Sequence, residues 1–189
     1  MANNLKVNEA KKEILSKLNG LEKILEIKDD DNRLIEELDF ELFLKILSFK
    51  TAQFNAPCYE RRLILKGCKK MPANKNCGDF IFPNILSNIE FKMSFSNKAS
   101  KINIRQIRLW QNCDYIICYC DYLNGKHLCY YLTHEQMGEE VNKRGSATHG
   151  TKIVNEQNKN IEYSITLDIN NTIWNKYIAD DKLKKFIFS

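Results

Sequence analysis

The chain lacks several features that would assign it to a common class of protein. None of its apolar runs approaches the roughly 20 residues that a membrane-spanning helix needs. Residues 1–12 are polar and charged, whereas a secretory leader requires an apolar segment near its start. The phosphate-binding patterns G-x-x-x-x-G-K and G-x-G-x-x-G are missing, as is a nucleophile elbow or cysteine-protease box. We therefore expect a cytoplasmic protein that does not contact a membrane, and neither nucleotide hydrolysis nor a Ser-His-Asp or Cys-His mechanism is indicated.

The seven cysteines form no C-x-x-C pair, and their number is odd. Cys118 and Cys120 alternate along an apolar run, a position that suits buried, reduced thiols. A disulfide scaffold is not expected in a chain of 189 residues without a secretory leader. A zinc site built from Cys58, Cys68 and Cys77 with a histidine remains an alternative, although these spacings are wide and irregular.

Length and composition indicate one globular domain. The 189 residues are 43% hydrophobic and 28% charged, which is ordinary for a folded domain. The net charge of +5 is by itself weak support for a nucleic-acid partner. The distribution of the cations is more informative, because six of them crowd the segment just before Asp79. They are Arg61, Arg62, Lys66, Lys69, Lys70 and Lys75.

Hydrophobic periodicity predicts an N-terminal helical region followed by a mixed α/β core. Residues 7–27 and 33–50 have amphipathic helix spacing and would form a helical hairpin, which either packs on the core or forms a dimer interface. Ala56-Pro57 marks a break after it. Further helices are expected over 58–65, 101–112 and 172–186 and from Thr133 onward. Strands are expected over 80–82, 89–95, 114–122, 126–132 and 161–167, with a hairpin turn at Asn124-Gly125. Loops are expected over 69–77 and 143–159.

Two acids and a lysine stand in and beside two of the predicted strands. Asp79 comes just before the strand over 80–82, and Glu90 and Lys92 lie two residues apart in the strand over 89–95. Strand side chains alternate between faces, so Glu90 and Lys92 point the same way. Two charges on one face of an apolar strand are costly unless they are paired or bound to a metal. With Asp79 beside them, they would form a hard-oxygen site suited to magnesium, with an ammonium at its edge. A surface hairpin with a Glu-Lys cross-pair is the alternative.

This arrangement resembles the core of the PD-(D/E)XK nuclease superfamily, the fold of most type II restriction endonucleases. The likeness covers about residues 58–132, and Gly78 stands where many members have a proline before the aspartate. The resemblance implies an α/β fold, with a central mixed β-sheet flanked by helices. It also implies that Asp79 and Glu90 hold Mg²⁺, and that Lys92 orients or deprotonates the attacking water. The residues that carry the likeness are Gly78-Asp79-Phe80 and Ile89-Glu90-Phe91-Lys92.

Two further residues become candidates through the same resemblance. Members often supply an additional acid from a helix upstream of the aspartate, and Glu60 occupies such a position, nineteen residues before Asp79. It would act as a catalytic and metal-binding residue, or else pair with Arg61 or Lys66 on an exposed helix. Gln106, on the helix expected after the Lys92 strand, corresponds to a polar residue that reaches the site in some relatives. A plain polar helix face is favoured for it.

A second segment, residues 143–152, combines glycines, hydroxyl groups, a histidine and cations. Glycine lets a backbone approach a ligand closely, and hydroxyls and cations bind phosphate, so we expect a DNA-contacting loop here, with a surface loop as the alternative. His127 and His134, outside this segment, are taken as incidental. The expected DNA-binding residues of the whole chain are Arg61, Arg62, Lys69, Lys70, Lys143, Arg144, Ser146, Thr148, His149 and Lys152.

Together these expectations describe a single nuclease domain over residues 1–189. Its parts are a helical extension over 1–55, a catalytic core over 56–135, and a DNA-contacting loop with a terminal strand and helix over 136–189. The expected activity is magnesium-dependent cleavage of double-stranded DNA by a homodimer of the type II restriction class. A repair or recombination nuclease and a non-catalytic DNA-binding protein on the same fold remain alternatives.

Overall fold

The computed structural model describes residues 39–47, 52–72, 77–95, 101–121, 126–149, 161–168, 170 and 172–189. The predicted helix over 7–27 and the predicted turn at Asn124-Gly125 lie outside these residues.

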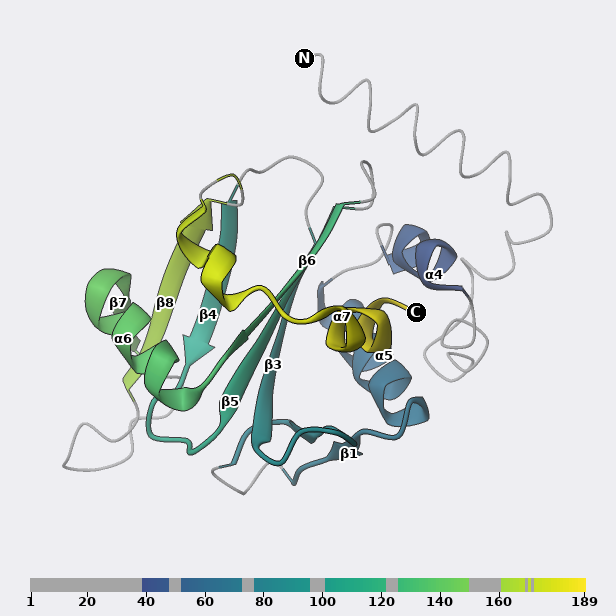
Figure 1. Ribbon diagram of the computed structural model, residues 1–189, viewed down its shortest axis with the longest axis horizontal. Helices are drawn as coiled ribbons and strands as arrows, with labels where there is room; N and C mark the ends of the chain where they lie inside the picture. The colour runs from purple at the N-terminus through teal and green to yellow at the C-terminus, as the bar shows by residue number, and fades with distance from the viewer. Residues whose placement is uncertain are drawn as a thin grey trace, which may run out of the picture.

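A five-stranded mixed sheet forms the centre of the molecule (Figure 1). Its strand order is β1-β2-β3-β5-β6, with β3 parallel to β5 and every other pair antiparallel. All eight residues of β5 are buried, because β5 has neighbouring strands on both edges and packed layers on both faces. The strands are β1 (Lys69–Lys70), β2 (Phe80–Ile81), β3 (Asn88–Phe95), β5 (Asp114–Asp121) and β6 (Lys126–Leu132).

Helices cover one face of this sheet. Tyr59 on α5 stacks on Phe91 of β3, with ring centroids 5.5 Å apart. Phe43 and Leu47 of α4 are buried in the same core. The described end of the predicted helical hairpin therefore packs on the core, which was one of the two alternatives predicted for it. These helices are α4 (Phe40–Leu47), α5 (Ala52–Leu65) and α7 (Asp181–Phe188).

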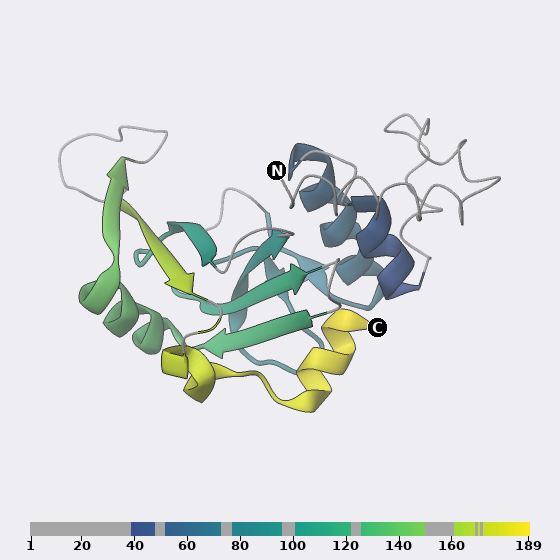
Figure 2. The same cartoon turned by 90° about the horizontal axis from the view of Figure 1, so that it is seen from above.

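A second, three-stranded sheet covers the other face (Figure 2). Its order is β4-β8-β7, and both pairs are antiparallel. Tyr115 and Ile117 of β5 meet Ile165 of β8 in the core between the sheets, which α6 and η2 complete. The prediction of an α/β fold with a central mixed sheet flanked by helices is confirmed. The elements of this layer are β4 (Lys101–Ile107), β7 (Ser146–His149), β8 (Ile161–Asp168), α6 (His134–Arg144) and η2 (Thr172–Tyr177).

The predicted helix over 101–112 is wrong, because residues 101–107 form β4. Ile102 and Ile104 alternate as in a strand, and the register then shifts before Ile107. The extra residue turns Ile107 back to the core, and it produces the three-residue spacing that imitates a helix. Gln106 lies in this bulge with φ 57°, not on a helix. The connection between the parallel strands β3 and β5 therefore runs through a strand of the second sheet.

Two other predicted helix boundaries differ from those in the structure. The predicted break at Pro57 is wrong, since α5 begins at Ala52 and contains Pro57. The terminal helix is divided, because residues 178 and 179 bond to β6 through the bridge Tyr130↔Ile178 and the Ala179 N–H, which donates to the Cys129 carbonyl at 2.9 Å. Asp180 then starts α7 by accepting from the Leu183 N–H at 2.7 Å.

The predicted loop over 143–159 is also partly wrong. Helix α6 continues to Arg144, and residues 146–149 form β7, which pairs with β8. Thr133 and Gln136 cap the start of α6 reciprocally, as their spacing predicted. At the other end the chain must turn beside Val141, and a Cβ at Gly145 would lie 2.6 Å from the Val141 carbonyl oxygen.

Candidate active site

Strands β2 and β3 bring the two predicted acids together. The register pairs Phe80 with Ile89, so its continuation sets Asp79 beside Glu90. In the parallel pair, Glu90 is opposite Tyr115 and Lys92 is opposite Ile117. Both partners face the core between the sheets, so Glu90 and Lys92 share the face of the central sheet that looks toward the second sheet.

Gly78 determines the backbone conformation of the chain just before Asp79. Its φ is +77°, a backbone conformation that a residue with a side chain rarely adopts and that proline cannot adopt. A Cβ at this position would lie 2.7 Å from the carbonyl oxygen of Ile89. The Asp79 N–H donates to that same oxygen at 2.8 Å. A glycine at position 78 is therefore required by the backbone geometry of this chain.

Asp79 extends the pairing of β3 beyond the short strand β2. Its Oδ2 accepts a hydrogen bond from the Phe91 N–H at 3.1 Å. Burial and, to a smaller extent, the nearby charge of Glu90 together raise the pKa of the Asp79 carboxyl to about 6, against the opposing effects of Lys92 and the Phe91 N–H. Two carboxylates thus share a poorly solvated space with one ammonium, and this excess of negative charge favours a bound cation.

Glu90 and Lys92 form an ion pair inside this space. Lys92 Nζ lies 2.5 Å from Glu90 Oε1. The Glu90 side chain is 2% exposed and that of Lys92 is 20% exposed, so the carboxylate is enclosed while the ammonium reaches toward solvent. A buried carboxylate with an ammonium at its open side can receive a metal-bound phosphate, because both the cation and the ammonium offset the phosphate charge.

Two residues of this site were not predicted from the sequence. Burial, together with the charges of Glu90 and Asp79, raises the pKa of the Cys113 thiol to about 12, so the thiol is influenced by both acids and stays neutral. The Tyr115 hydroxyl donates to the Arg108 carbonyl at 3.2 Å, and Tyr115 is the partner of Glu90 in the strand register. Cys113 alternates with Tyr115 and Ile117, so extending the predicted strand by one residue would have placed it on this face.

Glu60 lies farther from the other acids. It projects from α5 and forms an ion pair with Lys70 of β1. Its charge still contributes to the raised pKa of Asp79, but it is the smallest of the causes. Within the described part of the chain, no three His, Cys, Asp or Glu side chains lie close enough together to hold a metal ion. Asp79 and Glu90 fit magnesium nevertheless, because this ion commonly takes one or two carboxylates and completes its shell with water and phosphate.

The described residues do not assemble the alternative zinc site either. Cys58 and Cys68 are buried in the core under the helices, and Cys77 is partly exposed just before Gly78. All seven cysteines are free. These thiols therefore belong mainly to the packing, as the alternation of Cys118 and Cys120 predicted.

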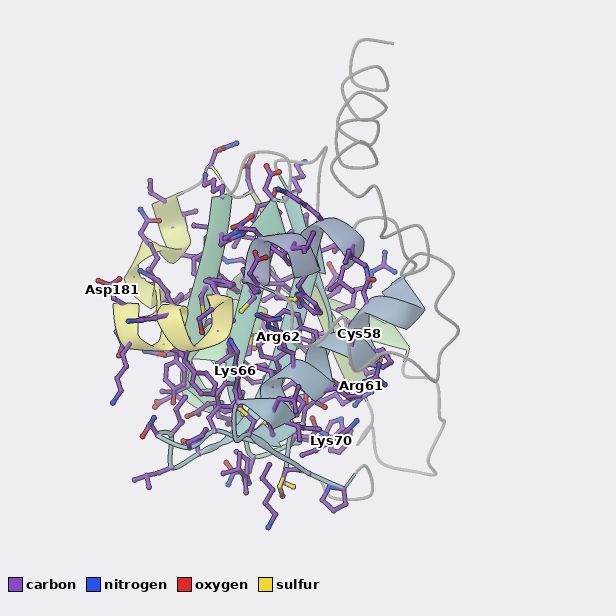
Figure 3. The ribbon with its side chains drawn as sticks, turned by 90° about the vertical axis from the view of Figure 1, so that its right-hand side faces the viewer. Cys58, Arg61, Arg62, Lys66, Lys70 and Asp181 are labelled. Atoms are coloured by element: carbon purple, nitrogen blue, oxygen red, sulfur yellow. The ribbon has the colours of Figure 1, made fainter. Side chains whose placement is uncertain are left out.

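The basic segment before Asp79 divides into interior and exposed cations (Figure 3). Arg62 is buried, donates to the Ser189 carbonyl at 2.8 Å, and lies 4.8 Å from the centroid of the Phe43 ring. Lys66 donates to the Phe186 carbonyl at 2.7 Å, and both side chains thereby tie α5 to the end of α7. Arg62 cannot reach a DNA backbone from this position. Arg61 approaches Cys58 Sγ at 3.5 Å.

The remaining predicted DNA contacts lie on β1, α6 and β7 or outside the described residues. Lys69 and Lys70 are exposed on β1. Lys143 and Arg144 pair with Glu139 and Glu140 on α6, at 3.0 and 2.8 Å. Ser146 is exposed on β7, the backbone of Thr148 and His149 continues that strand, and Lys152 lies outside the described residues.

Comparisons with known proteins assign the chain to no family. No model of a known protein family matches the chain, and no curated protein matches it either. None of the helices in the described ranges has the length and apolar character needed to cross a membrane.

Proposed function

We propose that this protein is a magnesium-dependent endonuclease of the PD-(D/E)XK type that cuts double-stranded DNA at a short specific site, as type II restriction enzymes do. The observation that carries the proposal is the convergence of Asp79, Glu90 and Lys92 on one face of the central sheet. Two enclosed carboxylates beside an ammonium serve no evident packing purpose, since an apolar trio would fill the same space at lower electrostatic cost.

Each residue has a distinct part in the proposed reaction. Asp79 Oδ1 and the Glu90 carboxylate would hold Mg²⁺, while Asp79 Oδ2 stays fixed by the Phe91 N–H. Bound magnesium lowers the pKa of a coordinated water and offsets charge that develops on the phosphate. Lys92, now on Glu90, would turn its ammonium to the scissile phosphate and orient the attacking water. Glu60 would add a further carboxylate to the metal site of Asp79 and Glu90, once its ion pair with Lys70 is broken.

The same proposal includes a homodimer in the cytoplasm. Two copies related by a two-fold axis would place one site on each strand of a palindromic sequence. The seven free cysteines support a reducing compartment.

Digestion of plasmid and linear DNA with Mg²⁺ tests the proposal. Wild type should produce discrete fragments, and both Asp79→Asn and Lys92→Met should reduce the cleavage rate by about 100-fold or more. The matched controls are Asp181→Asn and Lys182→Met, which change exposed residues of α7 and should cleave like wild type.

The products also separate the alternatives. Cleavage that persists undiminished in both site variants contradicts the site assignment. Cutting only at branches or mismatches favours a repair nuclease over a restriction enzyme. Salt-dependent DNA binding without cleavage under any metal would instead indicate a binding protein on this fold.

A further inference from the structure

The turn between β4 and β5, residues 108–113, is held firmly in place. The carbonyl oxygen of Arg108 accepts the Gln111 N–H at 3.0 Å and the Tyr115 hydroxyl at 3.2 Å. The Cys113 N–H donates to the Gln111 carbonyl at 3.1 Å. Leu109 packs against the core between the sheets. This turn is therefore a fixed feature of the surface.

The turn borders the candidate active site. Tyr115, which holds the turn at Arg108, is the direct partner of Glu90 in the register of β3 and β5. Cys113, the last residue of the turn, lies close enough to Glu90 and Asp79 for both charges to act on its thiol. A molecule that contacts the turn is thus near the acids as well.

The turn carries an exposed aromatic side chain, and arginines stand nearby in the sequence. Trp110 is 38% exposed, whereas the other tryptophan of the chain, Trp174, is fully buried. Arg108 Nε is held by Glu162 Oε1 at 2.9 Å, which leaves the terminal nitrogens of its guanidinium for another anion. Arg105 is exposed in the bulge that ends β4. Arg105 and Arg108 precede Trp110 by five and two residues on the same connection, and an exposed indole near such cations in the chain suits a partner that is flat, apolar and negatively charged at its edge.

We propose that the turn 108–113 binds a nucleic-acid strand through Trp110, whose indole stacks on a base that has left the helical stack, while Arg105 and Arg108 face the backbone phosphates. Stacking needs a free base face, which a continuous duplex hides and an unpaired, bulged or extruded base offers. This inference rests on the proposed function for what happens next, because the bound strand would then lie at Asp79 and Glu90. It adds that one base of the bound DNA is extruded from its stack at this turn.

Intrinsic fluorescence tests this contact without any cleavage. The protein, in EDTA, is titrated with a single strand, with the matching duplex, and with that duplex carrying one bulged base. The single strand and the bulged duplex should quench the tryptophan emission, and the fully paired duplex should bind more weakly. Because Trp174 is buried, the quenching should disappear in Trp110→Ala.

Affinity measured by anisotropy of a labelled strand completes the test. Trp110→Ala should weaken binding about tenfold or more, and Trp110→Phe should restore most of it, because phenylalanine can still stack. Leu86→Ala is the matched control, since Leu86 is a fully exposed apolar residue on another loop, and this variant should bind like wild type. An unchanged near-ultraviolet signal from Trp174 confirms folding.

The outcomes separate this inference from the proposed function. Equal affinity of wild type and Trp110→Ala, or no quenching by any of the three nucleic acids, overturns the inference even if the protein cleaves DNA. Loss of affinity in Trp110→Ala supports the inference, and if wild type also fails to cleave with Mg²⁺, only the proposed nuclease activity is overturned.

Discussion

Gly78 and Ile89 approach each other so closely that a Cβ at position 78 would lie 2.7 Å from the Ile89 carbonyl oxygen. The contact lets the Asp79 N–H reach that oxygen, and it sets the direction in which the Asp79 side chain leaves the backbone. A glycine outside the acid pair thus controls the geometry of the pair.

Replacing this glycine should disturb both stability and the site. Gly78→Ala should lower the free energy of unfolding by about 2–4 kcal/mol, because it combines a positive φ with a backbone clash. Urea denaturation measures the loss. Gly138→Ala is the matched control: a Cβ there meets nothing within 4 Å inside α6, so alanine should stabilise the helix by about 0.5–1 kcal/mol. Equal effects of the two substitutions would contradict the structural role of Gly78.

The raised pKa of Asp79 predicts a specific pH dependence. The folded protein favours the protonated carboxyl up to a pKa of about 6, whereas the unfolded chain ionises it near its ordinary value. Its stabilising contribution is therefore complete below about pH 4 and is lost as the pH rises through about 6. Relative to wild type, Asp79→Asn should gain up to about 3 kcal/mol of unfolding free energy between about pH 4 and pH 7.5.

Urea denaturation at both pH values measures this difference. Asp181→Asn changes an exposed acid and should follow wild type throughout. Magnesium should narrow the gap at about pH 7.5, because the cation stabilises the ionised carboxyl of wild type and not the amide. A gap independent of pH would show that Asp79 is not the titrating group.

The basic segment predicts two different consequences of losing a cation. Arg62→Gln should lower the free energy of unfolding by about 2 kcal/mol or more, because it removes the hydrogen bond to Ser189 and the packing on Phe43. Lys69→Gln should leave stability within about 0.5 kcal/mol, because Lys69 is exposed on β1. If the segment binds DNA, only Lys69→Gln should weaken binding without unfolding the protein. Thermal melts and anisotropy at one salt concentration separate the two effects, and a loss of DNA affinity by folded Arg62→Gln would contradict this division.

The part of the site that could be predicted is the part governed by local periodicity. Glu90 and Lys92 share a face because strand side chains alternate, and this holds whatever packs above them. The need for Gly78 could not be predicted, because its cause is a backbone contact with another strand. Arg62 was wrongly predicted to contact DNA. Its burial involves a contact with Ser189, 127 residues away, which the sequence does not reveal.

Strand β4 shows the same limit in the fold. Within one strand, Ile102 and Ile104 indicate a two-residue period, and Ile107 breaks it. Only the pairing with β8 reveals that the break is a bulge. Gln106 has a positive φ because of that bulge, and its residue type gave no sign of it. Burial and register shifts come from tertiary contacts, which a single sequence does not display.

A buried carboxylate outside the candidate site allows a matched comparison. Glu140 of α6 is fully buried and accepts from Trp174 Nε1 at 2.9 Å and the Tyr177 hydroxyl at 3.0 Å, and it pairs with Arg144 at 2.8 Å. Glu140→Gln should cost about 3 kcal/mol of unfolding free energy, because it leaves the partly buried Arg144 guanidinium without its carboxylate and turns an amide N–H toward another donor.

The neighbouring acid supplies the control. Glu139 pairs with Lys143 at 3.0 Å, but both side chains are about half exposed, so Glu139→Gln should cost about 0.5 kcal/mol or less. Urea denaturation of both variants at one pH measures the difference. The Glu140 contacts join α6 to η2 and so support the second sheet from its side. Glu140 is not one of the residues proposed to hold magnesium. If Glu140→Gln lowered the free energy of unfolding no more than Glu139→Gln does, the buried network would not be holding these elements together. Loss of stability only when Mg²⁺ is removed would instead link Glu140 to the metal.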